Sequence, residues 1–208
     1  MLKKIVLAVF LASVSVVAHA HAPQEKTEGH GRHDMNKMWA EMRSRPVGMA
    51  VSIAADEKGI LWLAQMREGH ILVSHSQDNG QHFSDAVAVN ALPESILAEG
   101  QNRPQIAARN GVIAVAWSQA LPKTFSGNIR FSRSVDGGKT FSAPVTINDA
   151  NDDAGHSFSA LTMSDNGNIT LAWLDGRNKK YTGSAIYYVT SQDGGASFSK
   201  NKKLVDHT

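Results

Sequence analysis

Ser134-Val-Asp136-Gly-Gly138-Lys-Thr-Phe141 is the stretch that decides the fold, because the chain carries it three times. The other copies are Ser76-Gln-Asp78-Asn-Gly80-Gln-His-Phe83 and Ser191-Gln-Asp193-Gly-Gly195-Ala-Ser-Phe198. In each copy the aspartate can accept hydrogen bonds from nearby N–H and hydroxyl groups, glycine supplies a positive φ, and phenylalanine returns the chain to the core. We interpret these aspartates and glycines as structural, since three copies on successive repeats cannot all face one site: Asp78, Gly80, Asp136, Gly138, Asp193 and Gly195.

A second repeated run precedes each of these turns. The runs are Gly59-Ile-Leu-Trp-Leu-Ala, Gly111-Val-Ile-Ala-Val-Ala-Trp117 and Gly167-Asn-Ile-Thr-Leu-Ala-Trp173. Apolar strands bounded by glycine and asparagine, repeated about every 57 residues, are typical of a unit of four antiparallel strands, as in a propeller blade. The sequence therefore predicts an all-β fold over residues 47–208, built from three four-stranded blades.

The three turn motifs resemble the Asp-box, or BNR, repeats of the sialidase-like β-propellers. The resemblance covers about residues 47–208 and implies part of a six-bladed propeller, with the remaining blades supplied by a longer chain or a second subunit. Asp boxes also occur in propellers that cleave no sugar, so the resemblance indicates a fold more than an activity.

The catalytic set of the sialidases is not visible in this sequence. The resemblance implies an arginine triad that clamps the substrate carboxylate, a Tyr-Glu nucleophile and an aspartate acid/base, with the first arginine in an Arg-Ile-Pro motif. This chain has no Arg-Ile-Pro, and its tyrosines, Tyr181, Tyr187 and Tyr188, all lie in the third repeat. No residue is assigned a catalytic role.

Two arginines are candidates for ligand contacts. When Ile53, Ile106 and Leu161 are aligned as one strand position, Ala50 and Phe158 stand opposite Arg103, so Arg103 is not a feature of the repeat. Arg177 follows Asp175 in the turn after the strand that ends Trp173-Leu-Asp175. We expect Arg103, Arg177 and Asp175 to contact a ligand; the alternatives are a surface ion pair or strand-end cap for Arg103 and a local pair between Arg177 and Asp175.

The N-terminus has the pattern of a secretory signal peptide over residues 1–20. Met1-Leu-Lys-Lys is a positive region, residues 5–17 are apolar, and Ala18-His19-Ala20 is a small-x-small cleavage site. The apolar run has 13 residues, short of the roughly 20 that span a bilayer. The protein is predicted to be exported, periplasmic or secreted, without a membrane span.

Composition excludes several classes of protein. The 208 residues are 42% apolar and 19% charged, which argues against wholesale disorder. The absence of cysteine excludes disulfides and thiolate chemistry. Removal of Lys3 and Lys4 with the signal peptide leaves 19 basic and 19 acidic residues, and a neutral chain has no general attraction to nucleic acid.

Residues 21–46 are predicted to form a flexible arm and a short helix over 34–44, capped by Asp34 and stopped by Pro46. Imidazole and thioether groups gather here, and such ligands favour copper when thiolates are absent: His21, His30, His33, Met35 and Met38. The alternative is a solvated arm and a helix whose methionines pack on the propeller, with no cofactor required. The acidic stretch from Asp149 to Asp153 is interpreted as a solvated loop, since it lacks the pattern of a calcium loop.

Three functions follow from these patterns. The first is a non-catalytic propeller that binds a glycan or a protein. The second is a sialidase-like glycoside hydrolase, an exo-α-sialidase, whose catalytic set is incomplete in this chain. The third is a periplasmic copper-binding protein that uses its arm.

Overall fold

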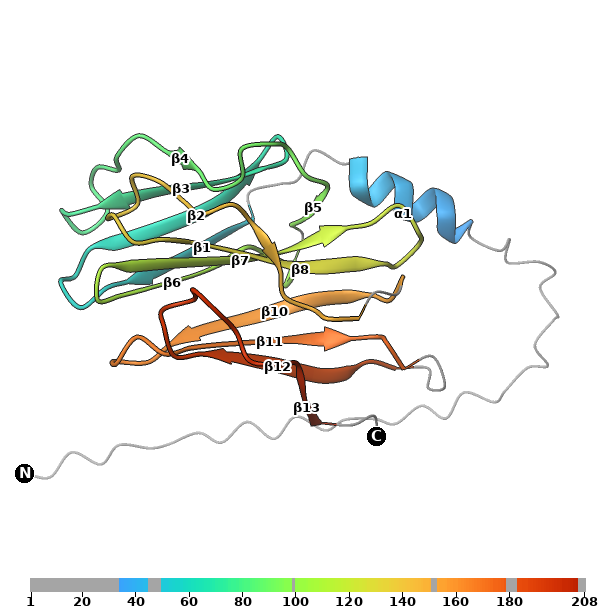
Figure 1. The fold of residues 1–208 in the computed structure, drawn as a ribbon. Coiled ribbons are helices and arrows are strands. Elements are labelled where there is room, and N and C mark those ends of the chain that lie inside the picture. The colour runs from blue at the N-terminus through green and yellow to red at the C-terminus, as the bar shows by residue number, and fades with distance from the viewer. Residues whose placement is uncertain (1–33, 45–49, 99, 151–152, 179–182, 206–208) are drawn as a thin grey trace, which may run out of the picture. The chain divides into compact units, whose positions relative to one another are not determined.

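Three antiparallel sheets follow one another along the chain (Figure 1). The computed structural model describes residues 34–44, 50–98, 100–150, 153–178 and 183–205. The first sheet is formed by β1 (Val51–Ala55), β2 (Leu61–Arg67), β3 (His70–Ser76) and β4 (Val87–Ala88). The second contains β5 (Ile96–Leu97), β6 (Gln105–Arg109), β7 (Val112–Ala120), β8 (Gly127–Ser134) and β9 (Val145–Thr146). The third is formed by β10 (His156–Met163), β11 (Ile169–Asp175), β12 (Ala185–Ser191) and β13 (Lys202–Val205).

The strand register repeats as the sequence alignment predicts. Ile53 pairs with Leu63, Ile106 with Val115, and Leu161 with Leu171, so the first two strands of each sheet meet at equivalent positions. The all-β fold and its blade-like sheets are confirmed. One difference is β5, a fifth short strand in the second sheet: β6 pairs only as far as Ala116 of the long strand β7, and β5 pairs with Ser118 and Gln119 beyond it.

Each sheet has two faces, because side chains alternate along a strand. In the second and third sheets, one face packs against the preceding sheet. We call this face, and the equivalent face of the first sheet, the upstream face. The opposite face of each sheet is the downstream face. The first core joins the downstream face of the first sheet to the upstream face of the second; its largest members are Trp62, Ile71, Val73, Ile106, Ile113, Val115 and Trp117. The second core joins the next pair of faces, through Ala116, Ile129, Phe131, Ile169, Leu171, Trp173 and Val189.

The predicted short helix is present as α1 (Met35–Ser44). Asp34 caps it, since Oδ1 of Asp34 accepts hydrogen bonds from the backbone N–H groups of Asn36 and Lys37, at 3.1 and 3.2 Å. Residues 34–208 form one compact unit. The predicted signal peptide, the arm and its histidines lie outside the described residues. Over the described ranges, no helix has the length and apolar character needed to cross a bilayer.

The three Ser-x-Asp turns, each placed after the third long strand of its sheet, share one hydrogen-bond pattern. Oγ of Ser76, Ser134 and Ser191 donates at 2.7 Å to the aspartate two residues later. The same Oγ atoms accept the backbone N–H of Gly80, Gly138 and Gly195 at 2.8 to 2.9 Å. Hydrogen bonds from the backbone and side chain of His82 and from Ser76 lower the pKa of Asp78 to about 2, and equivalent hydrogen bonds lower the pKa of Asp136 and of Asp193.

These turns also hold neighbouring sheets together. A Cβ atom added to Gly138 would lie 2.7 Å from Cζ3 of Trp62 in the preceding sheet, and one added to Gly195 would lie 2.6 Å from Cζ of Phe131. Arg133 of the second sheet donates from Nη1 to the carbonyl oxygens of Asp193 and Gly194, both at 2.9 Å. Glycine is required at these positions for two reasons, the positive φ of 78° and 85° and the contact with the ring.

Candidate functional site

A pocket of about 460 Å³ lies between the second and third sheets, at the end opposite the Ser-x-Asp turns. Strands β8 and β12 begin beside this pocket and end at those turns. The pocket is lined by Leu97, Asn102, Phe125, Ser126, Gly127, Gly155, His156, Ser157, Phe158, Gly176 and Ser184. A concave, mostly apolar pocket with a few polar groups is the usual form of a small-molecule site.

Two glycines, Gly127 and Gly155, let the backbones of the two sheets meet at the floor of the pocket. A Cβ atom on Gly155 would lie 2.5 Å from the carbonyl oxygen of Phe125, and one on Gly127 would lie 3.1 Å from that of His156. The N–H of Gly127 donates to the carbonyl of Ala154 at 3.1 Å, and the N–H of Gly176 donates to that of Gly155 at 2.9 Å. The floor is therefore a hydrogen-bonded contact between main chains, which fixes its shape.

Two phenylalanines on the wall have strained backbones. Phe125 and Phe158 have φ values of 56° and 55°, in the left-handed region that bulky residues rarely adopt. Each strained residue costs about 1 to 3 kcal/mol. The two residues are 46% and 45% exposed, so burial in the core does not explain the strain. Both residues line the pocket instead.

Neighbouring groups hold both residues in place. Phe158 lies in β10 where the register with β11 shifts between Ser157 and Ala160, and its N–H donates to Oδ1 of the buried Asn102 at 3.2 Å. Phe125 belongs to a turn in which the N–H of Ser126 donates to the carbonyl of Lys123 at 3.0 Å. The structure thus maintains two phenylalanines at a pocket at a cost in backbone energy.

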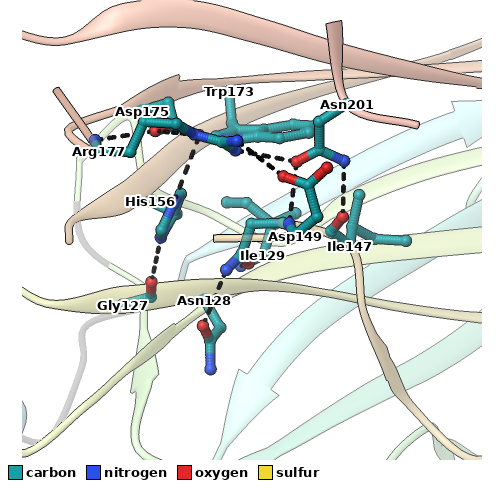
Figure 2. Close-up of polar contacts among 11 residues, drawn as sticks. Gly127, Asn128, Ile129, Ile147, Asp149, His156, Trp173, Asp175, Arg177 and Asn201 are labelled. Carbon is teal, nitrogen blue, oxygen red and sulfur yellow. Dashed lines mark hydrogen bonds and ion pairs between the residues drawn. The ribbon is translucent and has the colours of Figure 1, made fainter. Parts of the chain in front are cut away.

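One of the buried polar residues of the pocket is His156. Its ring is fully buried, and Nδ1 donates to the carbonyl of Gly127 at 2.8 Å, which fixes the proton on that nitrogen. Nε2 lies 3.4 Å from Oδ2 of Asp175 but makes no hydrogen bond of normal geometry. His156 thus connects the pocket to a charged cluster behind it (Figure 2).

Asp175 and Arg177 form the centre of this cluster. Arg177 donates from Nε and Nη2 to the two carboxylate oxygens of Asp175 at 2.8 and 2.7 Å, and from Nη1 to Asp149 at 2.7 Å. Asp175 also accepts the indole N–H of Trp173 at 2.9 Å. Burial raises the pKa of Asp175, but the adjacent His156 ring and the hydrogen bonds from Arg177 and Trp173 outweigh burial and lower it overall. Burial likewise lowers the pKa of Arg177, while Asp175 and Asp149 raise it overall.

The structure places the predicted ligand residues in two different regions. Arg177 and Asp175 lie behind the pocket, where the guanidinium also stacks 4.1 Å from the ring centroid of Tyr187. Arg103 is exposed and lines a separate pocket of about 260 Å³ with Ser52 and Gln105. Their roles as ligand contacts stay predictions.

The predicted metal groups are described only in part. Met35 and Met38 on α1 are 44% and 37% exposed. Among the residues that the structure describes, no group of three or more His, Asp and Glu side chains is arranged to hold a metal ion. Asp149 pairs with Arg177, and Asp153 pairs with Lys123 at 2.9 Å.

Sequence reasoning missed the pocket residues Phe125, Phe158, Asn102 and His156. One signal was available: Phe158 stands where the other repeats have Ala50 and Arg103, so the repeat does not explain its ring. Phe125 lies in a loop with no counterpart in the repeat, and the sequence carries no signal for it.

Comparison with known proteins shows the fold. No family model and no curated protein matches the sequence. Among solved structures, the chain resembles the α-L-arabinofuranosidase Arb93A from Fusarium graminearum (15% identity, 77% of this chain and 50% of that chain, TM-score 0.55). It also resembles a protein of unknown function from Dyadobacter fermentans (16% identity, 78% and 52%, TM-score 0.53). A third similar structure is an α-L-arabinanase from Penicillium chrysogenum (19% identity, 71% and 45%, TM-score 0.50).

These likenesses, together with the three sheets, identify the fold as part of a β-propeller. The chain spans about half the length of each of the three solved chains.

Proposed function

We propose that this chain is an exported propeller of the sialidase-like, Asp-box type that binds a neutral glycan between Phe125 and Phe158 without cleaving it. The observation that carries this proposal is the pair of exposed phenylalanines held at positive φ on one pocket. Backbone strain persists where surrounding structure maintains it, and it clusters at ligand sites.

The chemistry of the pocket suits a sugar. One face of a sugar ring carries C–H groups that pack on an aromatic ring, while its hydroxyls need hydrogen-bond partners. Asn102, Ser157 and Ser184 supply polar groups beside the two phenylalanines. None of the described lining residues is an arginine or lysine, so we expect neutral sugars rather than sialic acid.

The lack of cleavage is proposed from the same set of residues. Most glycosidases place two carboxyl groups on either side of the scissile bond. The described residues that line the pocket include no aspartate or glutamate, and Asp175 lies behind His156 in a pair with Arg177. Of the similar solved proteins, one is an arabinofuranosidase and one an arabinanase complexed with arabinobiose, which makes arabinobiose the first ligand to test.

Calorimetric titration of residues 21–208 with arabinobiose, longer arabino-oligosaccharides and sialyllactose tests this proposal. We expect binding of a neutral oligosaccharide and a loss of affinity of about 10-fold, or about 1.4 kcal/mol, for Phe158→Gly and for Phe125→Gly. Because glycine relieves the strain at positive φ, neither variant should melt at a lower temperature than the unchanged chain. The matched control is Phe83→Gly, since Phe83 is also exposed (41%) but lies at the Ser-x-Asp end.

Three results would contradict the proposal. Equal affinity in all three variants would remove the two rings from the site. Binding of sialyllactose alone would overturn the preference for neutral sugars. Release of reducing sugar from any of these ligands would make the chain a glycoside hydrolase.

We also propose copper binding through His21, His30, His33, Met35 and Met38. The supporting observation is the exposure of Met35 and Met38, whose thioether groups are available rather than packed in a core. Titration with Cu(I) and Cu(II), repeated without residues 21–44, tests it. Equal binding by the shortened chain would exclude the arm.

A further inference from the structure

The upstream face of the first sheet is open among the described residues. Ile53 is 60% exposed, whereas its counterpart Ile106 in the second sheet is 8% exposed. Phe83 is 41% exposed, whereas the equivalent Phe141 and Phe198 pack against the first and second cores. The upstream faces of the second and third sheets are covered by the downstream face of the sheet before them.

The downstream face of the third sheet is open in the same way. Ile186 and Tyr188 are half-buried, while the second sheet buries Ile129 and Phe131 completely at the equivalent positions. Leu174 on the neighbouring strand is 36% exposed. The equivalent downstream faces of the first and second sheets are each covered by the upstream face of the next sheet.

The Ser-x-Asp turns show how the two open faces fit each other. Gly138 and Gly195 contact Trp62 and Phe131 on the preceding sheet. Gly80 is the equivalent glycine of the first sheet. Among the described residues, only Leu61 and Phe83 of its own sheet lie within 4 Å of a Cβ atom added to it. Tyr188 occupies in the third sheet the position of Phe131. The chain forms this kind of interface between sheets twice. Over the described residues, it also carries both halves of a further such interface without a partner for either.

We infer that the open upstream face of the first sheet binds the open downstream face of the third sheet in a second copy of this chain. Two copies related by a twofold axis make this contact twice, which covers both open faces and brings six sheets together. A contact between two upstream faces would leave Leu174, Ile186 and Tyr188 uncovered, whereas head-to-tail contact covers every open face. Soluble proteins rarely leave large apolar faces exposed to water.

Light scattering and sedimentation velocity of residues 21–208 test this inference. The unchanged chain is expected to be a dimer. Ile53→Glu on one open face and Leu174→Glu on the other should each raise the dissociation constant at least about 100-fold, because each places a carboxylate in an apolar contact. The control Leu92→Glu changes a side chain that is 78% exposed and lies on neither face, so it should remain dimeric. Circular dichroism establishes that each variant is folded.

Mixing the variants distinguishes head-to-tail contact from other arrangements. A mixed dimer of the Ile53→Glu and Leu174→Glu chains has both altered faces in one contact and none in the other. We therefore expect the mixture to recover dimers that neither variant forms alone. A monomeric unchanged chain, or a Leu174→Glu chain as dimeric as the unchanged one, would overturn the inference. None of these outcomes depends on glycan binding.

Discussion

The two ends of the sheets differ in how far the three repeats resemble one another. At the Ser-x-Asp end, the three turns share the same hydrogen bonds within about 0.1 Å between serine Oγ, aspartate and glycine. At the pocket end, β2 and β3 are joined by residues 68–69, β7 and β8 by residues 121–126, and β11 and β12 by residues 176–184. Uniform turns hold the sheets together, and the varied loops form a site on that scaffold.

The two ends also differ in which residue types adopt positive φ. At the Ser-x-Asp end, positive φ falls on glycines and on Asn79 and Asn110, residue types that adopt it at low cost. At the pocket end it falls on Glu68, Phe125 and Phe158, residue types for which positive φ is costly. The first end is built for stability, and the second accepts a loss of stability to place two rings.

The largest effect is expected from Gly138→Ala at the Ser-x-Asp end. The methyl group would lie 2.7 Å from Trp62 and the residue would keep a φ of 78°. We expect a loss of about 2 to 4 kcal/mol in the free energy of unfolding, measured by urea denaturation. Glycan affinity should not change.

Gly137→Ala and Gly80→Ala distinguish the cost of positive φ from the cost of the contact that Gly138 makes with Trp62. Gly137 has a φ of 74°, and no atom of the described residues lies within 4 Å of an added Cβ atom, so Gly137→Ala should cost only about 1 kcal/mol. Gly80→Ala should behave like Gly137→Ala in a monomer. If Gly138→Ala and Gly137→Ala were equally destabilising, the contact with Trp62 would contribute nothing.

A smaller loss is expected from Arg177→Met behind the pocket. The change leaves the fully buried Asp175 without its guanidinium partner, and we expect the free energy of unfolding to fall by about 2 to 3 kcal/mol. Because Asp175 lies beside His156, glycan affinity should fall as well, unlike in Gly138→Ala. The control is Arg67→Met. Arg67 forms an exposed ion pair with Glu68 at 3.8 Å, so its loss should change the free energy of unfolding by less than about 0.5 kcal/mol. Unchanged stability in Arg177→Met would show that the cluster does not support the fold.

The difference between the ends also explains what the sequence could predict. The Ser-x-Asp turns and their strands are local patterns, so the repeat, its register and the helix cap at Asp34 follow from residue order. The pocket depends on contacts between residues far apart in sequence, such as Gly155 against Phe125 and Asn102 against Phe158. The short strand β5 has the same origin, since it exists because β7 extends past β6.

The smallest effect is expected from Asp78→Asn, and it depends on pH. The folded state lowers the pKa of Asp78 from 3.8 to about 2, so its carboxylate stabilises the fold fully above about pH 4, and this contribution is lost as the pH falls toward 2. The unchanged chain should therefore melt at a higher temperature than Asp78→Asn at pH 6, and the two melting temperatures should approach each other between pH 4 and pH 2. Glycan affinity at pH 6 should be equal, because the turn lies at the opposite end from the pocket. A melting-temperature difference that is the same at pH 6 and pH 2 would mean that the charge of Asp78 does not stabilise its turn.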